Sequence, residues 1–238
     1  MPPPRASAPM SALPPERRLL VFGRLPEAGR AKTRLAPALG EEEAAELYSA
    51  FLDDAVKGAT GTAPVELWVP ERPDAVSSLE RRYPGVRVRL QPEGSLGERL
   101  ETAFEAAFGD GADYAVAVGS DHPTLPPDML PRAFRALRGA HLVLGPSRDG
   151  GYYAIGIRRH AWPRAAGLFR GAPWSDPGLL SWTRARASEL DLCHVELPAW
   201  YDVDRPEDLE RMEADLSPGT ATAVAWARLR PVGAGEGG

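Results

Sequence analysis

Short apolar runs alternate with amphipathic segments along most of this 238-residue chain, and this alternation most limits what it can fold into. Residues 19–23 form an apolar run of strand length. Residues 41–58 carry apolar side chains at the three- and four-residue spacing of a helix that is buried on one face. Strands that alternate with helices form a mostly parallel sheet covered by helices on both faces, so we expect a single α/β domain.

The same patterns give the positions of the expected elements. The expected strands are residues 19–23, 65–69, 86–90, 114–119, 141–145, 152–157 and 192–197. The expected helices are residues 41–58, 74–82, 98–108, 127–137, 161–169, 176–189 and 206–216. The residues expected to be buried in the sheet include Leu20, Phe22, Leu67, Val69, Val116, Val118, Leu142 and Leu144.

The two ends of the chain lack this pattern. Residues 1–17 are rich in Pro and Ala and have no apolar segment of the secretory-signal type, so they predict a disordered leader. Residues 217–238 end in a Gly-rich stretch and predict a flexible tail, which leaves residues 18–216 as the domain. With one cysteine, Cys193, no internal disulfide can form, and a cytoplasmic protein is expected.

Charge and hydropathy exclude two classes of partner. The net charge of −5 argues against a general nucleic-acid binder, which normally carries a basic excess. The apolar runs are far too short to span a bilayer, so no membrane span is expected. A small-molecule ligand is the remaining expectation, and in open α/β sheets such ligands bind beyond the carboxyl ends of the strands.

The loop after the first expected strand is strongly cationic. It holds four cations within eleven residues, including Arg24, Lys32 and Arg34, and Gly29 would let the backbone approach a ligand. Lys32 is one of only two lysines beside 26 arginines. Cations and free amides suit a phosphate chain, although the spacing of a Walker A loop is absent. The alternative is a solvated basic loop.

Two acidic motifs lie at other strand ends. Ser120 and Asp121 close the strand at residues 114–119, where a carboxylate would hold a hard divalent cation or cap the next helix. One carboxylate binds magnesium poorly, and the sequence Asp202-Val203-Asp204 would supply a second. In an extended segment Asp202 and Asp204 point to the same side. The alternative makes Asp204 the N-cap of the last expected helix, with Glu207 completing a capping box.

Glycine-containing loops follow two further strands. Gln91 could pair with a base edge through its amide, and the glycines after it, Gly97 among them, would leave room for the ring. The sequence Asp149-Gly150-Gly151-Tyr152 precedes the strand at residues 152–157. Two adjacent glycines indicate either a close backbone approach to a ligand or a hairpin turn, and the sequence leaves both open.

Taken in order, these motifs resemble one family. They are Lys32-Thr33-Arg34-Leu35, Gln91 with Leu96-Gly97-Glu98-Arg99, Gly119-Ser120-Asp121-His122-Pro123, Gly145-Pro146 with Asp149-Gly150-Gly151-Tyr152-Tyr153, Trp174 with Thr183, and Asp202-Val203-Asp204 with Pro206-Glu207-Asp208. They are similar to bacterial glycosyltransferase-like proteins, often labelled arsenosugar-biosynthesis glycosyltransferases. That group resembles a branch of the nucleotide-diphospho-sugar transferase superfamily with a GT-A-like (Rossmann-like) fold. The likeness runs over about residues 18–212.

The resemblance implies a role for each motif. The first loop, with Arg24, Gly29, Lys32 and Arg34, would cradle the nucleotide phosphates. Gln91, Gly97 and Ser120 would also bind the nucleotide. Asp121 and Asp204 would be the catalytic pair that holds Mg²⁺ or Mn²⁺. Asp149, Gly150, Gly151, Tyr152 and His122 would contact the substrate.

Two positions depart from the family pattern. Arg24 stands one place from a position that is commonly Lys, so the charge is kept without the point-like contact of an ammonium. His122 stands where Cys is frequent. This histidine would be a polar contact to substrate or a residue without a role at the start of a helix.

Three functions remain open at this point. The resemblance implies a metal-dependent glycosyltransferase that uses a nucleotide-diphosphate sugar as donor and a small molecule as acceptor. The Lys32-Thr33-Arg34-Leu35 loop also resembles the phosphate loop of nucleotidyltransferases such as the phospholactate guanylyltransferases, and a strongly cationic loop suits a triphosphate. Such an enzyme joins a nucleoside triphosphate to a phosphorylated small molecule and releases pyrophosphate. The third possibility is a nucleotide-binding protein without turnover, against which the retained acid pair argues.

Overall fold

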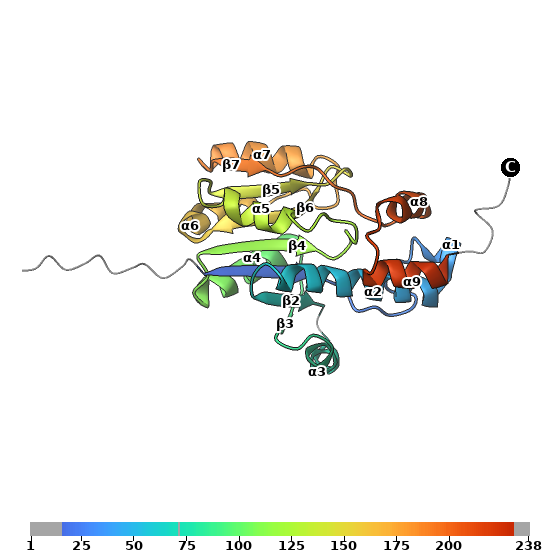
Figure 1. Ribbon diagram of the computed structural model, residues 1–238. Helices are drawn as coiled ribbons and strands as arrows, with labels where there is room; N and C mark the ends of the chain where they lie inside the picture. Colours follow the sequence, from blue (N-terminus) through green and yellow to red (C-terminus); the bar gives the residue numbers. More distant parts are fainter. Residues whose placement is uncertain (1–15, 71, 231–238) are drawn as a thin grey trace, which may run out of the picture.

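Seven strands form the central sheet of the computed structural model, which describes residues 16–70 and 72–230 (Figure 1). They are β1 (Arg17–Phe22), β2 (Val65–Val69), β3 (Arg87–Leu90), β4 (Tyr114–Gly119), β5 (Leu142–Pro146), β6 (Tyr152–Arg158) and β7 (His194–Glu196). Their order in the sheet is β3-β2-β1-β4-β6-β5-β7. All neighbouring strands are parallel except that β6 is antiparallel to β4 and β5. The predicted mostly parallel α/β sheet is confirmed.

The reversal of β6 follows from the length of its connection. Only residues 147–151 separate β5 from β6. Parallel neighbours need a crossover of a dozen or more residues, whereas antiparallel strands can be joined by a short turn. Of the two interpretations of Gly150 and Gly151, the hairpin turn is therefore the one that the structure shows.

Helices cover both faces of the sheet (Figure 1). One face packs against α2 (Glu41–Thr60), α3 (Pro73–Arg82) and α5 (Met129–Ala136). The other packs against α4 (Leu96–Gly109), α6 (Trp162–Ala165) and α7 (Leu179–Glu189), with 3₁₀ turns at Arg159–Ala161 and Ala166–Leu168 on either side of α6. At the end of the sheet where β1 and β4 finish lie α1 (Ala36–Leu39), α8 (Pro206–Asp215) and α9 (Ala221–Leu229). No helix within the two described ranges is both long and apolar enough to cross a membrane.

Alternate strand residues build the two faces of the core. Leu19 and Val21 point to the α2 side, and Leu20 points to the α4 side, as the two-residue period of a strand requires. Every residue expected to be buried in the sheet is buried except Phe22. Phe22 is half-buried because it ends β1, where it stacks on Trp68 with ring centroids 6.2 Å apart and lines a cleft.

The C-terminal segment differs from the flexible tail expected from residue 217 onward. Ala221–Leu229 forms helix α9, whose residues Ala225 and Trp226 are buried and which packs against α2. The sequence feature that marks the start of this helix is Thr220, the N-cap, whose hydroxyl oxygen accepts a hydrogen bond from Ala223 N. At the other end β1 begins at Arg17, inside the expected leader, and residues 1–15 and 231–238 lie outside the described residues.

A third group of buried residues joins α9 to the end of the sheet. We call it the carboxyl-end cluster. It contains Ala31 and Leu35 of the first loop, Tyr48 and Phe51 of α2, Tyr201 and Val203 of the loop before α8, Leu209 and Met212 of α8, and Ala225 and Trp226 of α9. Segments far apart in the sequence are thus packed together around the loops that were expected to carry the chemistry.

Candidate active site

A cleft of about 530 Å³ opens where β1, β2, β3 and β4 end. Loops that follow these parallel strands form most of its wall, as expected for a ligand site in an open α/β sheet. The lining residues are Phe22, Gly23, Arg24, Leu25, Glu27, Arg30, Tyr48, Pro70, Arg72, Gln91, Leu96, Arg99, Gly119, Ser120 and Asp121. Four arginines thus face two carboxylates, so the wall attracts anionic ligands.

The arginines of this wall are not equally engaged. Glu27 pairs with both Arg30 and Arg72, at 3.3 Å and 3.1 Å. Arg99 donates a hydrogen bond to Gln91 Oε1 over 3.3 Å. Arg24 is exposed, and within the described ranges its guanidinium has no carboxylate partner. The contact of Arg24 with a phosphate stays a prediction.

Beside the cleft, Lys32 brings Asp121 and Asp204 together. Lys32 Nζ lies 2.5 Å from Asp121 Oδ1 and 3.7 Å from Asp204 Oδ1. The second oxygen of Asp204 accepts a hydrogen bond from Arg34 over 2.7 Å. Burial tends to raise the pKa of Asp121, but the Lys32 ammonium outweighs it and lowers this pKa below the usual value. Asp121 is therefore a carboxylate at neutral pH.

Tyr48 fixes the first loop to the end of β4. Its hydroxyl lies 2.7 Å from Ser120 Oγ and accepts a hydrogen bond from Arg24 N over 2.7 Å. Burial, helped by the nearby Asp121 carboxylate, raises the pKa of Tyr48 to about 12, so the phenol stays neutral. Tyr48 was not predicted as a site residue, because the helical pattern marked it only as part of the buried face of α2.

The loop before α8 aims Asp204 at the site and leaves the helix cap to another residue. Asp208 accepts hydrogen bonds from the backbone N atoms of Asp204 and Arg205, over 2.9 Å and 2.7 Å. The alternative in which Asp204 caps this helix with Glu207 is therefore wrong. Val203 N donates to Asp121 O over 2.9 Å, which ties this loop to the end of β4.

Asp202 has no role in that cap. It is half-buried, and burial, together with the nearby Asp149 and Asp121 carboxylates, raises its pKa above the usual value. The structure gives it no hydrogen-bond partner among the described side chains. It adds negative charge around the Asp121 and Asp204 pair.

The residues present fit a divalent cation that is bound together with a phosphate ligand. Within residues 16–70 and 72–230, no group of three or more His, Cys, Asp or Glu side chains could hold a metal ion alone. The Oδ1 atoms of Asp121 and Asp204 nevertheless face the same cationic nitrogen. Mg²⁺ is commonly held by one or two carboxylates, with waters and substrate phosphates as its other ligands.

Lys32 and Arg34, which were expected to bind the nucleotide phosphates, pair with the two carboxylates, and three further residues expected to contact the nucleotide also have roles within the protein. The Gln91 amide donates to Trp68 O over 2.8 Å and to Gly23 O over 3.4 Å, and its Oε1 accepts from Arg99, so Gln91 is engaged within the cleft wall and its contact with a base stays a prediction. A Cβ at Gly97 would lie 2.7 Å from Phe169 O, so this glycine permits close packing, and Leu96 lines the cleft instead. Gly29 lies outside the cleft wall and supplies the positive φ of 70° that its turn requires.

The residues expected to contact the substrate do not line this cleft. Asp149 accepts a hydrogen bond from Gly151 N over 3.0 Å in the turn between β5 and β6. A Cβ on Gly150 would overlap Pro177 O, which explains the glycine by packing. The Tyr152 ring packs edge-on against Trp174, and burial raises the pKa of Tyr152 above its usual value. Their contact with an acceptor stays a prediction.

His122 likewise points away from the cleft. Its ring lies 5.7 Å from that of Tyr153 and borders a separate cavity of about 60 Å³ beside α2. Burial lowers its pKa to about 4, although the Asp121 carboxylate acts in the opposite direction, so the imidazole is neutral. Arg30 and Arg72, by contrast, line the cleft. Arg30 was counted among the four cations of the first loop but not named as a site residue, and nothing in the sequence around Arg72 separates it from other surface arginines.

Comparisons with known proteins show the family of this chain. The family described as "Uncharacterized protein conserved in bacteria (DUF2064)" matches residues 54–176. The 2-phospho-L-lactate guanylyltransferase of Methanopyrus kandleri is 32% identical over 182 residues, which cover 76% of this chain and 84% of that protein. The phosphoenolpyruvate guanylyltransferase of Nocardia farcinica is 29% identical over 225 residues, which cover 86% of this chain and 87% of that protein.

A solved structure is similar over almost the whole fold. It comes from Desulfovibrio desulfuricans G20 and is provisionally assigned as a nucleotide-diphospho-sugar transferase. It superposes with a TM-score of 0.83 and 29% identity, and the match covers 90% of this chain and 95% of that chain. These likenesses support the superfamily that the motifs indicated. The chain is therefore a transferase of the nucleotide-diphospho-sugar transferase superfamily, and it belongs to the DUF2064 family.

Proposed function

We propose that this protein is a metal-dependent nucleotidyltransferase that transfers a guanylyl group from GTP to a phosphorylated small carboxylic acid. The observation that carries the proposal is the pair of carboxylates, Asp121 and Asp204, that meet at one cation beside a cleft lined by four arginines. The guanylyl group and the type of acceptor come from the names of the two relatives that match most of the chain. Nucleotidyl transfer, which was an alternative in the sequence analysis, is therefore preferred here over glycosyl transfer.

The reaction moves one phosphorus atom between two oxygens. A phosphate oxygen of the acceptor attacks the α-phosphorus of the nucleotide, and the bond from that phosphorus to the oxygen bridging the β-phosphorus breaks. The bridging oxygen leaves with pyrophosphate, and the acceptor carries a new diphosphate linkage. Catalysis of such a step depends on positioning and on stabilising charge, since little covalent chemistry falls to the protein.

The residues of the cleft divide this work. Arg24 binds phosphate oxygens, and Tyr48 holds the Arg24 backbone against Ser120. Asp121 and Asp204 would hold the metal. A metal held there would neutralise the negative charge that develops as pyrophosphate leaves. Arg30, Arg72 and Arg99 raise the positive potential of the wall and favour binding of a triphosphate.

Glycosyl transfer is the second candidate function. The observation in its favour is the 29% identity and close superposition with the D. desulfuricans structure assigned to nucleotide-diphospho-sugar transfer. Both reactions need a cationic site for a nucleotide diphosphate unit. They differ in the bond that breaks, which is at the α-phosphorus in nucleotidyl transfer and at the sugar anomeric carbon in glycosyl transfer.

A product assay separates these functions. The purified chain is incubated with Mg²⁺, each of the four nucleoside triphosphates and a panel of phosphorylated 2-hydroxy and enol acids. Pyrophosphate release is measured, and the product is identified by ³¹P NMR and mass spectrometry. We expect pyrophosphate and a new diphosphate signal with GTP only when an acceptor is present. A parallel panel of nucleotide sugars that yields nucleoside diphosphate and a glycosylated acceptor, without pyrophosphate from any triphosphate, would overturn the proposal.

A further inference from the structure

Lys32 occupies a confined position for a charged residue. Its side chain is only 5% exposed, and its Nζ lies 5.9 Å from the ring centroids of both Tyr48 and Phe51. Its backbone has a φ of 49°, in the left-handed region that residues other than glycine seldom adopt. An ammonium that has lost most of its water needs anionic partners. The loop therefore holds this cation at one place.

That place lies between the two carboxylates proposed to bind the metal. Lys32 Nζ is 2.5 Å from Asp121 Oδ1 and 3.7 Å from Asp204 Oδ1, while Arg34 pairs with the other oxygen of Asp204. Lys32 and Arg34 balance the charges of Asp121 and Asp204, and the half-buried Asp202 beside them adds one negative charge. A divalent cation that approaches the protein alone thus finds Asp121 already in close contact with an ammonium, and the two neighbouring cations offset most of the negative charge that would attract it.

We infer that Lys32 is a resident substitute for the divalent cation, which keeps Asp121 and Asp204 together in the nucleotide-free protein and moves to the nucleotide phosphates when the metal enters. The inference rests on the proposed function, since it concerns the same metal and the same phosphates. The triphosphate is essential to the exchange because it supplies new anionic partners for the displaced ammonium. Within the described residues, Asp121 and Asp204 are the carboxylates that pair with Lys32.

Two binding properties follow. The metal alone should bind weakly, because it must displace a desolvated ammonium whose ion-pair partners among the described residues are Asp121 and Asp204 themselves. The metal and the nucleotide should each strengthen binding of the other, and by the same factor, as thermodynamic linkage requires. Removing the charge of Lys32 should therefore strengthen binding of the metal alone, which is the opposite of what the loss of an ordinary site residue does.

The first test measures Mn²⁺ binding without nucleotide, by the electron paramagnetic resonance signal of free Mn²⁺. We expect Lys32→Met to bind Mn²⁺ at least about tenfold more tightly than the wild type, because a unit charge within 4 Å of the site is removed. Lys32→Arg keeps the charge and should stay weak. Lys57→Met is the matched control, since it removes the only other lysine, which is exposed on α2. Adding Asp121→Asn to Lys32→Met should abolish the gain.

A second test uses the unaltered protein and so does not depend on the folding of a variant. The chain has two lysines, so labelling with [¹³Cε]lysine gives two side-chain signals, with Lys57 as the internal reference. Mg²⁺ alone and α,β-methylene-GTP alone should leave the Lys32 signal near its starting position. The two together should shift it, while the Lys57 signal stays in place.

The inference is overturned if folded Lys32→Met binds Mn²⁺ no more tightly than the wild type, or if the Lys32 signal is unchanged when metal and analogue are both bound. These measurements need no turnover. A protein that forms no nucleotidyl product but gains Mn²⁺ affinity in Lys32→Met would refute the proposed function and keep the inference. If the protein forms the nucleotidyl product but Lys32→Met gains no Mn²⁺ affinity, the proposed function stands and the inference about Lys32 is refuted.

Discussion

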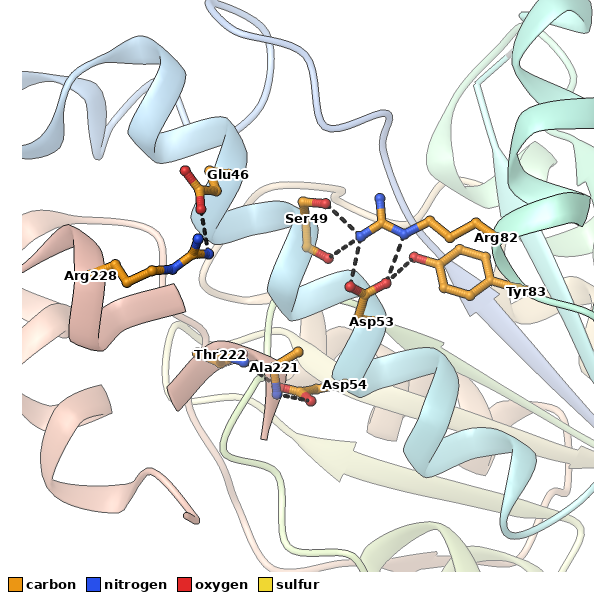
Figure 2. Close-up of polar contacts among 9 residues, drawn as sticks. All are labelled: Glu46, Ser49, Asp53, Asp54, Arg82, Tyr83, Ala221, Thr222 and Arg228. Atoms are coloured by element: carbon orange, nitrogen blue, oxygen red, sulfur yellow. Dashed lines mark hydrogen bonds and ion pairs between the residues drawn. The ribbon is translucent and has the colours of Figure 1, made fainter. Parts of the chain in front are cut away.

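Asp54 holds the C-terminal helix in place, and its replacement tests how much that helix contributes to stability. Figure 2 shows the Asp54 carboxylate on α2 facing the first turn of α9. Its two oxygens accept hydrogen bonds from Ala221 N and Thr222 N, both over 2.8 Å. These amides belong to the first turn of the helix, where no intrahelical acceptor exists. Asp54→Ala removes both acceptors and a negative charge at the positive end of the helix dipole.

The expected loss can be derived from these contacts. Removal of a side-chain cap costs about 0.5–2 kcal/mol, and a favourable charge at a helix N-terminus adds about 0.3–1 kcal/mol. Asp54 is half-buried, so water replaces part of what is lost. We therefore expect the free energy of unfolding to fall by about 2 kcal/mol, which lowers the melting temperature of a domain of this size by about 4–8 °C.

Urea denaturation followed by tryptophan fluorescence measures this loss, and hydrogen exchange shows whether the α9 amides lose protection first. The matched control is Glu46→Ala, which breaks an exposed ion pair to Arg228 between the same two helices (Figure 2). Exposed ion pairs contribute about 0–1 kcal/mol, so this variant should stay close to the wild type. Equal losses in the two variants would refute the argument that the cap, rather than general contact between α2 and α9, holds the helix.

Three further outcomes are expected from the site. Gly97→Ala should lower the free energy of unfolding by about 1–3 kcal/mol through overpacking against Phe169 O, and an unchanged urea midpoint would contradict the packing role. Arg24→Ala should raise the Kd for GTP in isothermal titration by about 5- to 150-fold with an unchanged melting temperature, and an unaltered Kd would remove Arg24 from the phosphate site. Asp121→Asn and Asp204→Asn should each abolish most turnover. The double variant should be no slower than the slower single variant. Additive losses in the rate of pyrophosphate release would mean that the two carboxylates do not share one metal.

The order of strands and helices was predictable because their hydrophobic periods differ clearly. The strands at Val65–Val69 and Tyr114–Gly119 have the predicted bounds. Val65–Val69 is apolar except for Glu66 and is followed by Pro70, and Tyr114–Val118 is an apolar run that ends at Gly119. Helix α9 was not predicted. Its sequence is mostly apolar and gives no strong one-sided pattern, and Pro218-Gly219 before it is typical of a chain that leaves its fold. Packing on α2, rather than periodicity, makes this segment a helix.

The glycines of the site show why function is harder to predict than fold. A sequence shows that a side chain is absent, but it does not show what occupies the space. Gly97 was interpreted as room for a ligand, and for Gly150 a close approach to a ligand was one of two interpretations. The space beside them belongs to Phe169, Trp174 and Pro177, which lie far along the chain. The cationic loop was more informative, because the distances show Lys32 and Arg34 on two acids that the motifs had also marked.

The meeting of Asp121 and Asp204, 83 positions apart, could be expected from the resemblance but not from local pattern. Near the start of α8, Asp204, Glu207 and Asp208 could each be the helix cap or a site residue, and helix propensity does not distinguish between these roles. The structure assigns the cap to Asp208 through the backbone N atoms of Asp204 and Arg205. Because the cap is provided from within the helix, the Asp204 side chain can face Lys32 without cost to α8. The backbone hydrogen bond from Val203 N to Asp121 O then fixes the distance between the two loops, independently of the side chains that are proposed to bind the metal.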